Sequence, residues 1–561
     1  MKRVILWALV LLTFAIVFAH SPVPTDMSSV IVQSDSVETA VTAVQAHGGD
    51  VTNSLSIIHA VSAQIPSSQM AALQADLRVQ HVYTDDTVHV AGTLVNDGSN
   101  TPDTPESDFP EVVGANAAWE YGIKGEGVTV AVVDTGIAPF DWNTGRILAR
   151  FDAVTDGEVP ADILSYDLHG HGTIMASLIG NNRMDNDGFI GIAPEVDFVD
   201  VRVLQADGSG NYTDILEGLD WVLSNKDAYN IRVVNLSIIG GVTGPYWSNP
   251  LNQAVEALWA NGLVVVAAAG NGGPQPLTIS TPGNDPFVIT VGSFTDNFTP
   301  DDPGDDYVTE FSGAGPSETG FIKPDVVLPG AHLTAVVRHK TTFGYDNPDS
   351  RLDGQYYQVA GTSTSTAVAS GVVALMLQAN PDMTPNEAKY ALMETAQPAI
   401  YEDGSLVWSV FQQGAGRVWA PEAVLNPPAG TANGDMMPGG QYVGPVIYRD
   451  GAFRIVNGDG NDIVDASGYL WTGGYLWTGG YLWTGGYLWT GGYLWTGGYL
   501  WTGSTDWQLL SDTDLWQSGY SWIPSANSWP GGYLWTGGYL WTGGYLWTGG
   551  YLWTGLVDAG D

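Results

Sequence analysis

Apolar runs alternate with amphipathic stretches between residues 111 and 426. The runs are nearly continuous and rich in β-branched residues, which is typical of parallel strands buried on both faces. Amphipathic stretches such as YTDILEGLDWVLSN and NPLNQAVEALWANG lie between them and predict helices. This alternation predicts a doubly wound α/β domain with a mostly parallel sheet, whose functional site lies at the carboxyl ends of the strands. The runs are VTVAVVD, DFVDVRVL, IRVVNLSI, LVVVAAAG, FVITVGS and DVVLPG.

A shorter pattern of strands and helices occupies residues 25–95. In order, SSVIVQ predicts a strand, SVETAVTAVQAHGG a helix, SLSIIHAVSAQIP a strand, SSQMAALQADLRV a helix and VYTDDTVHV a closing strand. The first helix ends at two glycines, a common stop signal. This order predicts a small α+β unit of the ferredoxin-like type. Residues 96–110 then turn to Asp, Pro, Thr, Ser and Gly, which indicates an exposed linker.

Residues 1–21 have the layout of a secretory signal. Lys2 and Arg3 precede an apolar run of about 16 residues, which is short for a membrane span. The alternative is an uncleaved N-terminal anchor. We therefore expect a secreted, extracellular protein, either released or held at the cell surface.

The net charge limits the possible binding partners, and the cysteine content limits how the protein can be stabilised. The 561 residues include 60 acidic and 18 basic ones, for a net charge of −42. Nucleic acid and anionic membranes are excluded as partners, because both are also negative. The chain has no cysteine, so an exported protein must rely on its core or on bound cations for stability.

The C-terminal part is dominated by a repeat. Residues 427–468 are rich in Gly, Pro and Asp and indicate a linker. Residues 469–555 then hold YLWTG six times from Tyr469 and four times from Tyr533, around an irregular insert at 504–532. Hairpins of YLWT joined by GlyGly would gather aromatic side chains for a cell-wall or polysaccharide surface. The alternative is a low-complexity segment with little fixed structure.

Four motifs together indicate nucleophilic catalysis. Asp134 lies in VAVVDTGI, His171 in HGHGTIMAS, Asn271 in VVVAAAGNGG and Ser363 in GTSTSTAVASG. A serine attacks an amide only with an oriented base and with donors for the oxyanion, and these residue types supply each part. Taken singly, DTG is also found in aspartic proteases, and His169 with His171 could form a metal pair. Only the agreement of all four motifs is specific.

At these motifs residues 111–426 resemble the subtilisin-like serine proteases, in which the three triad residues follow this chain order. The resemblance implies a serine endopeptidase acting through an acyl-enzyme, with Asp134, His171 and Ser363 as the triad and Asn271 as the oxyanion donor. It implies no redox or organic cofactor. Backbone recognition of protein or peptide substrates would involve the cleft residues Gly208, Ser209, Gly210 and Ser237.

Two segments depart from the family pattern. The residues after the nucleophile, TSTAV from Thr364 to Val368, replace the usual Met-Ala-Ser-Pro-His. The segment NLSIIGG replaces the common NLSLGG, which changes the wall of the main specificity pocket.

The N-terminal unit resembles the inhibitor propeptide of the same family. This resemblance implies an inactive precursor, with the chain's own propeptide as an intramolecular inhibitor, and self-cleavage between His89 and Pro110. The alternative to a protease is a non-catalytic cell-surface or polysaccharide-binding protein that uses the aromatic repeats and retains a relic protease domain.

A structural calcium ion is the one bound group that the sequence suggests. The loop RMDNDGFIGIAP resembles a calcium-binding loop of these proteases, with Asp185 as a ligand and Asp141 as its partner. The competing interpretation is a polar surface turn. NGDGNDIVD, around Asp459 and Asp462, resembles a single turn of a calcium-binding repeat.

Overall fold

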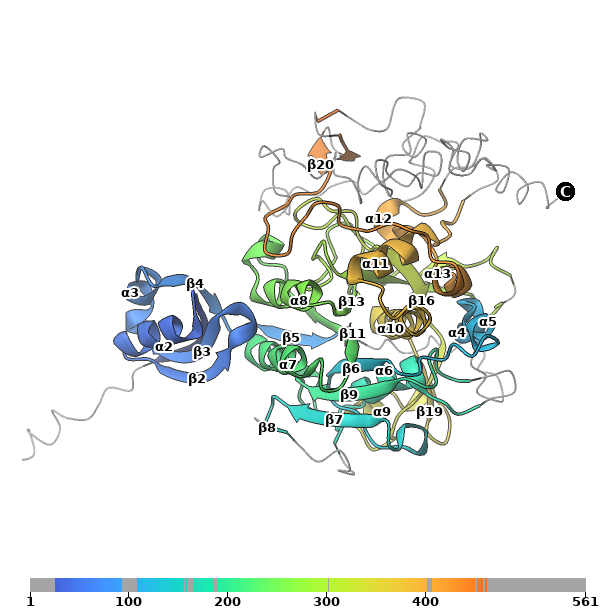
Figure 1. Cartoon of the computed structure of the whole chain (residues 1–561), viewed down its shortest axis with the longest axis horizontal. Helices are drawn as coiled ribbons and strands as arrows, with labels where there is room; N and C mark the ends of the chain where they lie inside the picture. Colours follow the sequence, from blue (N-terminus) through green and yellow to red (C-terminus); the bar gives the residue numbers. More distant parts are fainter. Residues whose placement is uncertain are drawn as a thin grey trace, which may run out of the picture. The chain divides into compact units, whose positions relative to one another are not determined.

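The computed structural model describes residues 26–92, 108–155, 157–158, 166–184, 189–300, 302–400, 406–449, 452–457 and 460–461. The chain divides into two units, Met1–Asp85 and Asp86–Asp561 (Figure 1). The predicted signal at 1–21 and the repeats at 469–555 lie outside the described residues, as does most of the linker at 96–110.

The first unit contains a four-stranded antiparallel sheet in the order β2–β3–β1–β4. Ser36 begins the main helix by accepting a hydrogen bond from the Thr39 backbone N–H at 3.2 Å. Apolar side chains of this helix and of β1 and β3 form the core, in the β-α-β-β-α-β order of a split β-α-β unit. The elements are β1 (Met27–Ser34), α2 (Val37–Ala46), β2 (Asp50–Leu55), β3 (Ala60–Pro66), α3 (Met70–Gln74) and β4 (Val79–Thr84), with 3₁₀ turns at Ser56–Ile58 and Ser67–Gln69.

The expected closing strand of this unit is two strands. β4 ends at Thr84, and β5 (Thr87–Val90) belongs to the second unit, where it pairs with β10 (Ser209–Asn211) and β12 (Ile238–Gly240). A run of β-forming residues predicts a strand but not the sheet that the strand joins.

The second unit is built on a nine-stranded sheet in the order β15–β14–β13–β11–β6–β9–β7–β8, with β16 also pairing with β14. Its central strands are parallel, and β15 and β8 are antiparallel additions at the edges. The predicted mostly parallel α/β sheet is confirmed. The strands are β6 (Thr129–Asp134), β7 (Ile147–Asp152), β8 (Gly157–Glu158), β9 (Asp197–Arg202), β11 (Ile231–Leu236), β13 (Val264–Ala268), β14 (Ile289–Thr295), β15 (Tyr307–Val308) and β16 (Val326–Pro329).

Helices cover both faces of this sheet. α6 (His171–Gly180) and α10 (Thr362–Ala379) pack on one face, and α7 (Tyr212–Asn225) and α8 (Pro250–Ala260) on the other (Figure 1). α10 is buried on all sides from Thr362 to Leu377, as expected for a helix in the centre of a large core.

Shorter elements complete the unit. They are α4 (Phe109–Val112), α5 (Ala115–Trp119), β17 (Leu333–Val336), α9 (Thr342–Asp346), β18 (Arg351–Asp353), β19 (Tyr356–Val359), α11 (Pro385–Glu394), α12 (Val410–Gln413) and α13 (Ala420–Leu425), with 3₁₀ turns at Asp141–Asn143, Tyr246–Ser248 and Pro348–Ser350.

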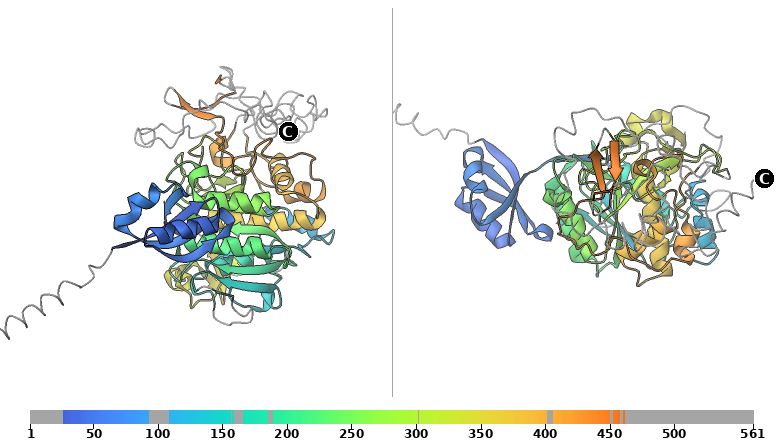
Figure 2. Two further views of the ribbon diagram at one scale, coloured as in Figure 1. Left: turned by 60° about the vertical axis from the view of Figure 1, so that its left-hand side comes forward. Right: turned by 90° about the horizontal axis from the view of Figure 1, so that it is seen from above.

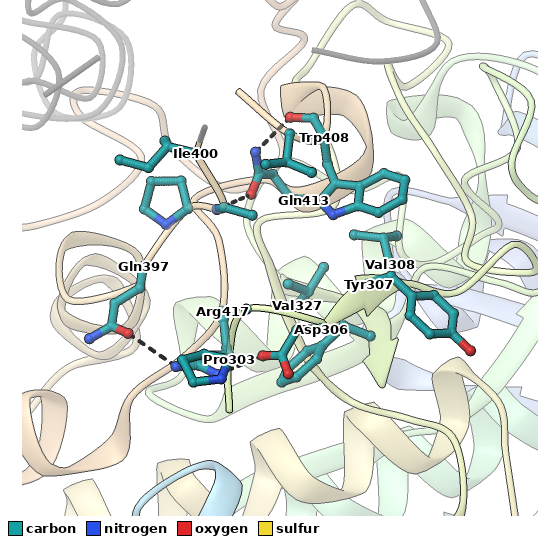
Figure 3. A pocket seen from close by; sticks show the side chains of 15 residues that line it. Pro303, Asp306, Tyr307, Val308, Val327, Gln397, Ile400, Trp408, Gln413 and Arg417 are labelled. Atoms are coloured by element: carbon teal, nitrogen blue, oxygen red, sulfur yellow. Dashed lines mark hydrogen bonds and ion pairs between the residues drawn. The ribbon is translucent and has the colours of Figure 1, made fainter. Parts of the chain in front are cut away.

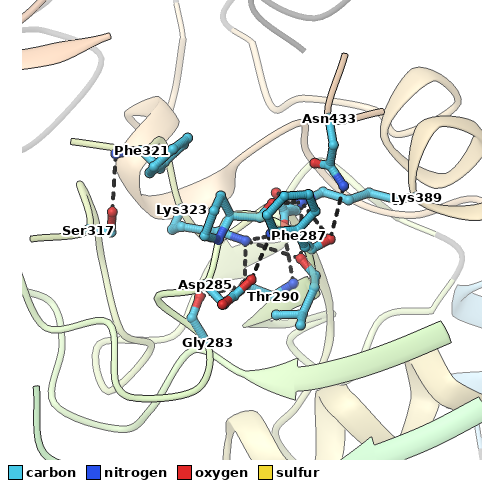
Figure 4. Close-up of polar contacts among 12 residues, drawn as sticks. Gly283, Asp285, Phe287, Thr290, Ser317, Phe321, Lys323, Lys389 and Asn433 are labelled. Atoms are coloured by element: carbon cyan, nitrogen blue, oxygen red, sulfur yellow. Dashed lines mark hydrogen bonds and ion pairs between the residues drawn. The ribbon is translucent and has the colours of Figure 1, made fainter. Parts of the chain in front are cut away.

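A buried ionic cluster ties α11 to the sheet (Figure 4). Lys323 donates to Asp325 at 2.8 Å and to the Thr290 hydroxyl at 2.7 Å, and Lys389 lies 3.1 Å from the same aspartate. All three charged side chains are 0% exposed. Burial lowers the pKa of Lys389 to about 7, against the attraction of Asp325. Asp325 is thus shared by two lysines, and Lys389 is held further by the carbonyl oxygens of Pro286 and Val288.

Part of the predicted linker at 427–468 is folded onto the second unit. The Tyr246 hydroxyl donates to the Gly440 carbonyl and accepts from the Tyr442 N–H, both at 3.0 Å. A hairpin of β20 (Val446–Arg449) and β21 (Ala452–Ile455) follows, and its two strands lie side by side in Figure 2. Phe453 of this hairpin is buried against Phe411. The Gly and Pro content signalled irregular backbone but not this packing.

Within the described ranges, none of the helices combines the length and the apolar character needed to cross a membrane.

Candidate active site

The candidate site begins where a buried strand ends and a helix starts. Asp134 is the last residue of β6, and His171 is the first of α6. His171 Nδ1 lies 2.8 and 2.9 Å from the two carboxylate oxygens of Asp134, and both side chains are 0% exposed. A carboxylate can only accept here, so Nδ1 carries the hydrogen, and in the neutral imidazole Nε2 is then the nitrogen with the lone pair. A Cβ on Gly172 would lie 2.3 Å from the Gly136 carbonyl oxygen, so only glycine permits this approach.

The candidate nucleophile lies at the start of a second helix. Ser363 is the second residue of α10 and is fully buried. Its hydroxyl donates to the Ala91 carbonyl oxygen at 2.9 Å. His171 Nε2 is buried, and among the described residues it has no hydrogen-bond partner. The imidazole is therefore held at one nitrogen and available as a base at the other.

The Asn271 side-chain amide donates to the same Ala91 carbonyl oxygen as the Ser363 hydroxyl. Asn271 Oδ1 accepts from the Thr362 N–H and from the Thr362 hydroxyl, each at 2.9 Å. These bonds direct the amide nitrogen toward the carbonyl oxygens of Ala91 and, at 2.8 Å, Gly92. Gly361 has a φ of 147°, and a Cβ there would lie 2.6 Å from the Gly92 oxygen. The site thus presents a hydroxyl and an amide N–H to one peptide oxygen.

A strand of the chain itself occupies the cleft. β5, which is labelled in Figure 1, is the middle strand of the sheet β10–β5–β12. In this sheet Ser209 lies opposite His89 and Gly210 opposite Val88. The Gly208 carbonyl accepts from the Val90 N–H at 3.0 Å. The Ser237 carbonyl accepts from the Ala91 N–H, also at 3.0 Å. Gly208, Ser209, Gly210 and Ser237 therefore lie along one extended peptide, and the last bond leads to the Ala91 carbonyl.

Of two further residues beside the site, Thr362 was not singled out from the sequence, and His169 was named there only as a possible metal pair with His171. Thr362 fixes the Asn271 amide, and its only signal was its place in GTS. His169 is buried, and a Cβ on Gly208 would lie 2.9 Å from its Nε2 and 3.2 Å from Val90. Burial lowers the pKa of His169, and the positive form of nearby His171 lowers it further. His169 is thus a neutral wall of the cleft beside Val90.

The two predicted metal ligands are not brought together among the described residues. Asp141 is paired with Arg183, which lowers the pKa of Asp141, and Asp185 lies outside the described residues together with Asp459 and Asp462. In the part of the chain that is described, no group of three or more His, Cys, Asp or Glu side chains could hold a metal ion. Because the Arg183 guanidinium already pairs with the Asp141 carboxylate, this arrangement does not favour Asp141 as a calcium ligand. Calcium binding stays a prediction.

A separate cavity of about 330 Å³ contains none of the predicted catalytic residues. Its wall includes the indole of Trp408 and the ring of Tyr307, and Arg417 lies between Asp306 and Gln397 (Figure 3). Arg417 donates to Asp306 at 2.6 Å. No nucleophile with an adjacent base lines this space, so the chemistry points to the cleft occupied by β5.

Comparisons with known proteins give one family. A model described as the subtilase family matches residues 125–416. The serine protease AprX of Bacillus subtilis is 38% identical over 309 residues, covering 54% of this chain and 67% of that protein. An extracellular serine proteinase of a Thermus species is 30% identical over 347 residues, covering 62% and 73% respectively.

Among solved structures, fervidolysin of Fervidobacterium pennivorans, described as a keratinolytic enzyme related to subtilisin, superposes with a TM-score of 0.59. The identity is 21%, and the match covers 73% of this chain but only 62% of fervidolysin. This likeness supports the fold alone.

Proposed function

The chain belongs to the subtilase family of serine proteases, and we propose that Asp134, His171 and Ser363 carry its peptide-bond hydrolysis. The main support is that the Ser363 hydroxyl lies 2.9 Å from a peptide carbonyl oxygen and that His171 and Asp134 form a buried pair. The intact pair and the oriented amide of Asn271 argue against a relic protease domain.

The proposed reaction has two halves. The Ser363 hydroxyl turns from the carbonyl oxygen toward His171, whose Nε2 takes the proton as Oγ bonds to the carbonyl carbon. His171 returns that proton to the leaving amine, which leaves an ester on Ser363. A water molecule then attacks the ester by the same proton transfers and frees the acid. Asp134 holds Nδ1 protonated and balances the imidazolium, while Asn271 and the Ser363 backbone N–H stabilise the oxyanion.

The same chemistry would act on the chain's own segment. The Ala91 carbonyl oxygen accepts from both Ser363 and Asn271, so the bond between Ala91 and Gly92 is the proposed cut. This bond lies within the predicted range of His89 to Pro110. The strand that ends at Ala91 would stay paired with β10 and β12 after the cut, and so would act as an inhibitor.

Purified full-length protein and its Ser363→Ala variant test both parts. We expect a wild-type fragment that ends at Ala91 in a mass-spectrometric peptide map, an intact variant chain, and a covalent adduct at Ser363 with a fluorophosphonate. Cleavage of the purified variant at the same bond would exclude self-processing. Wild-type protein that forms no adduct once the N-terminal segment is removed would instead indicate the relic, surface-binding alternative.

Secretion is part of the proposal. It is supported by the signal-like residues 1–21 and by the extracellular serine proteinase among the relatives. We expect the protein in the medium when residues 1–21 are present and inside the cell when they are deleted. Retention of both forms in the membrane fraction would favour an anchor.

A further inference from the structure

The strand in the cleft buries its side chains selectively. Val88 and Ala91 are each 0% exposed, whereas His89 is exposed and Val90 is half-buried. With the cut after Ala91, these are the fourth and first residues before the cut. Because the backbone bonds of β5 would suit any sequence, we expect selection among substrates to come mainly from the two enclosed side chains.

The space around Val88 is apolar and of aliphatic size. A Cβ on Gly240 would lie 3.4 Å from one methyl group of Val88, and a Cβ on Gly210 would lie 3.6 Å from the other. The Cβ placed on Gly210 would also lie 2.7 Å from Leu204, and the Cβ placed on Gly240 would lie 3.2 Å from the hydroxyl of the buried Tyr212. The Tyr212 hydroxyl already accepts from Asn249 at 3.0 Å. A charged side chain in place of Val88 would therefore lose its water in apolar surroundings, where the Tyr212 hydroxyl is a single neutral group beside it.

An isoleucine of β12 is placed near Ala91 by the register of the ladder. Ile239 lies opposite His89 in the β5–β12 ladder, and the bond from the Ala91 N–H to the Ser237 carbonyl continues that register. Side chains at i and i+2 share a face of a strand, and opposite residues share it too. Ile239 is therefore the diagonal neighbour of Ala91 on the same face. It stands in the segment NLSIIGG, which has two isoleucines where the common NLSLGG has one leucine.

We propose that this protease selects peptides with a small apolar residue directly before the cut and an aliphatic residue three places earlier, and that Ile239 sets the size limit at the first position. The specificity inference rests on the proposed function. The chain's own sequence Val88-His89-Val90-Ala91 then represents the preferred substrate class, and larger side chains before the cut meet the branched side chain of Ile239.

Internally quenched peptides that contain TVHVAG test this, with the processed enzyme prepared from the full chain. We expect kcat/KM to fall at least tenfold when Phe replaces the Ala before the cut, and at least a hundredfold when Asp replaces the first Val. The first change adds bulk against Ile239, and the second buries a charge among apolar groups with no cation beside it in the described contacts.

The matched variants are Ile239→Gly and Ile239→Val. In Ile239→Gly we expect the ratio of kcat/KM for the Ala peptide to that for the Phe peptide to fall below threefold, because kcat/KM for the Phe peptide rises. In Ile239→Val we expect a ratio between those of wild type and Ile239→Gly. A wild-type preference for Phe, or an unchanged ratio in either variant that folds, would overturn the size limit while leaving the protease assignment intact. Absence of both cleavage and fluorophosphonate labelling would overturn the proposed function, and this inference with it.

Discussion

Thr362→Val tests whether the oxyanion donor depends on its neighbour for orientation. Asn271 Oδ1 accepts two hydrogen bonds, and both come from Thr362. Valine has nearly the same shape but no hydroxyl, so one of the two bonds is lost. A neutral hydrogen bond contributes about 0.5–1.5 kcal/mol net, and each 1.36 kcal/mol of barrier is about a tenfold change in rate.

We therefore expect kcat to fall by about 2- to 13-fold, with KM changed less than twofold. We expect kcat to change more than KM because the Asn271 amide stabilises the oxyanion of the transition state more than the bound substrate. The buried Gly270 N–H also loses its acceptor, the Thr362 hydroxyl at 3.2 Å, so we expect a stability loss of about 1–3 kcal/mol.

Steady-state kinetics on a quenched peptide and urea unfolding measure the two effects. Thr362→Ser keeps the hydroxyl and should restore kcat to within twofold of wild type. The reasoning fails if Thr362→Ser loses as much kcat as Thr362→Val, or if the valine variant loses activity through KM alone.

Three further predictions concern other parts of the second unit. Asp134→Asn should lower kcat by about 10⁴, because an amide can hold His171 in the wrong tautomer; unchanged burst kinetics would contradict this. Lys389→Met should cost about 1–3 kcal/mol in urea unfolding, because Asp325 keeps its pair with Lys323 but the buried carbonyl oxygens of Pro286 and Val288 lose a donor, and an unchanged free energy of unfolding would contradict this. Burial, reinforced by a neighbouring carboxylate, raises the pKa of Glu256 from 4.5 to about 9. The folded state therefore keeps a proton that the unfolded state loses, and stability falls as pH rises from 4.5 through 9. Glu256→Gln should flatten the decline of Tm between pH 5 and pH 9, and an identical decline in both proteins would exclude Glu256 as its cause.

The placement of Asp134 and Asn271 could be predicted from the sequence. Each follows a buried apolar run, and the carboxyl ends of parallel strands meet at one edge of a sheet. His171 and Ser363 each open a helix that packs on that sheet. Local pattern was therefore sufficient to predict where these four residues lie on the strands and helices, while their catalytic roles stay a prediction.

The position of β5 could not be predicted in the same way. VYTDDTVHV has strand-forming residues throughout, but nothing in them encodes a break after Thr84 or pairing with β10 and β12. Likewise, Lys323 and Lys389 are residues of a type usually found in water. Their burial depends on Asp325, which is distant from Lys389 in the sequence and reaches it only through the packing of α11. Long-range pairing of this kind leaves no periodic signal.

The folded segment after Asn426 has a practical consequence for shortening the protein. A version that stops where the repeating α/β pattern ends would strip Tyr246 and Phe411 of their covering residues. It would expose apolar rings and invite aggregation. The C-terminal boundary of an expressed protein is better placed beyond Asn457, so that the β20–β21 hairpin is retained.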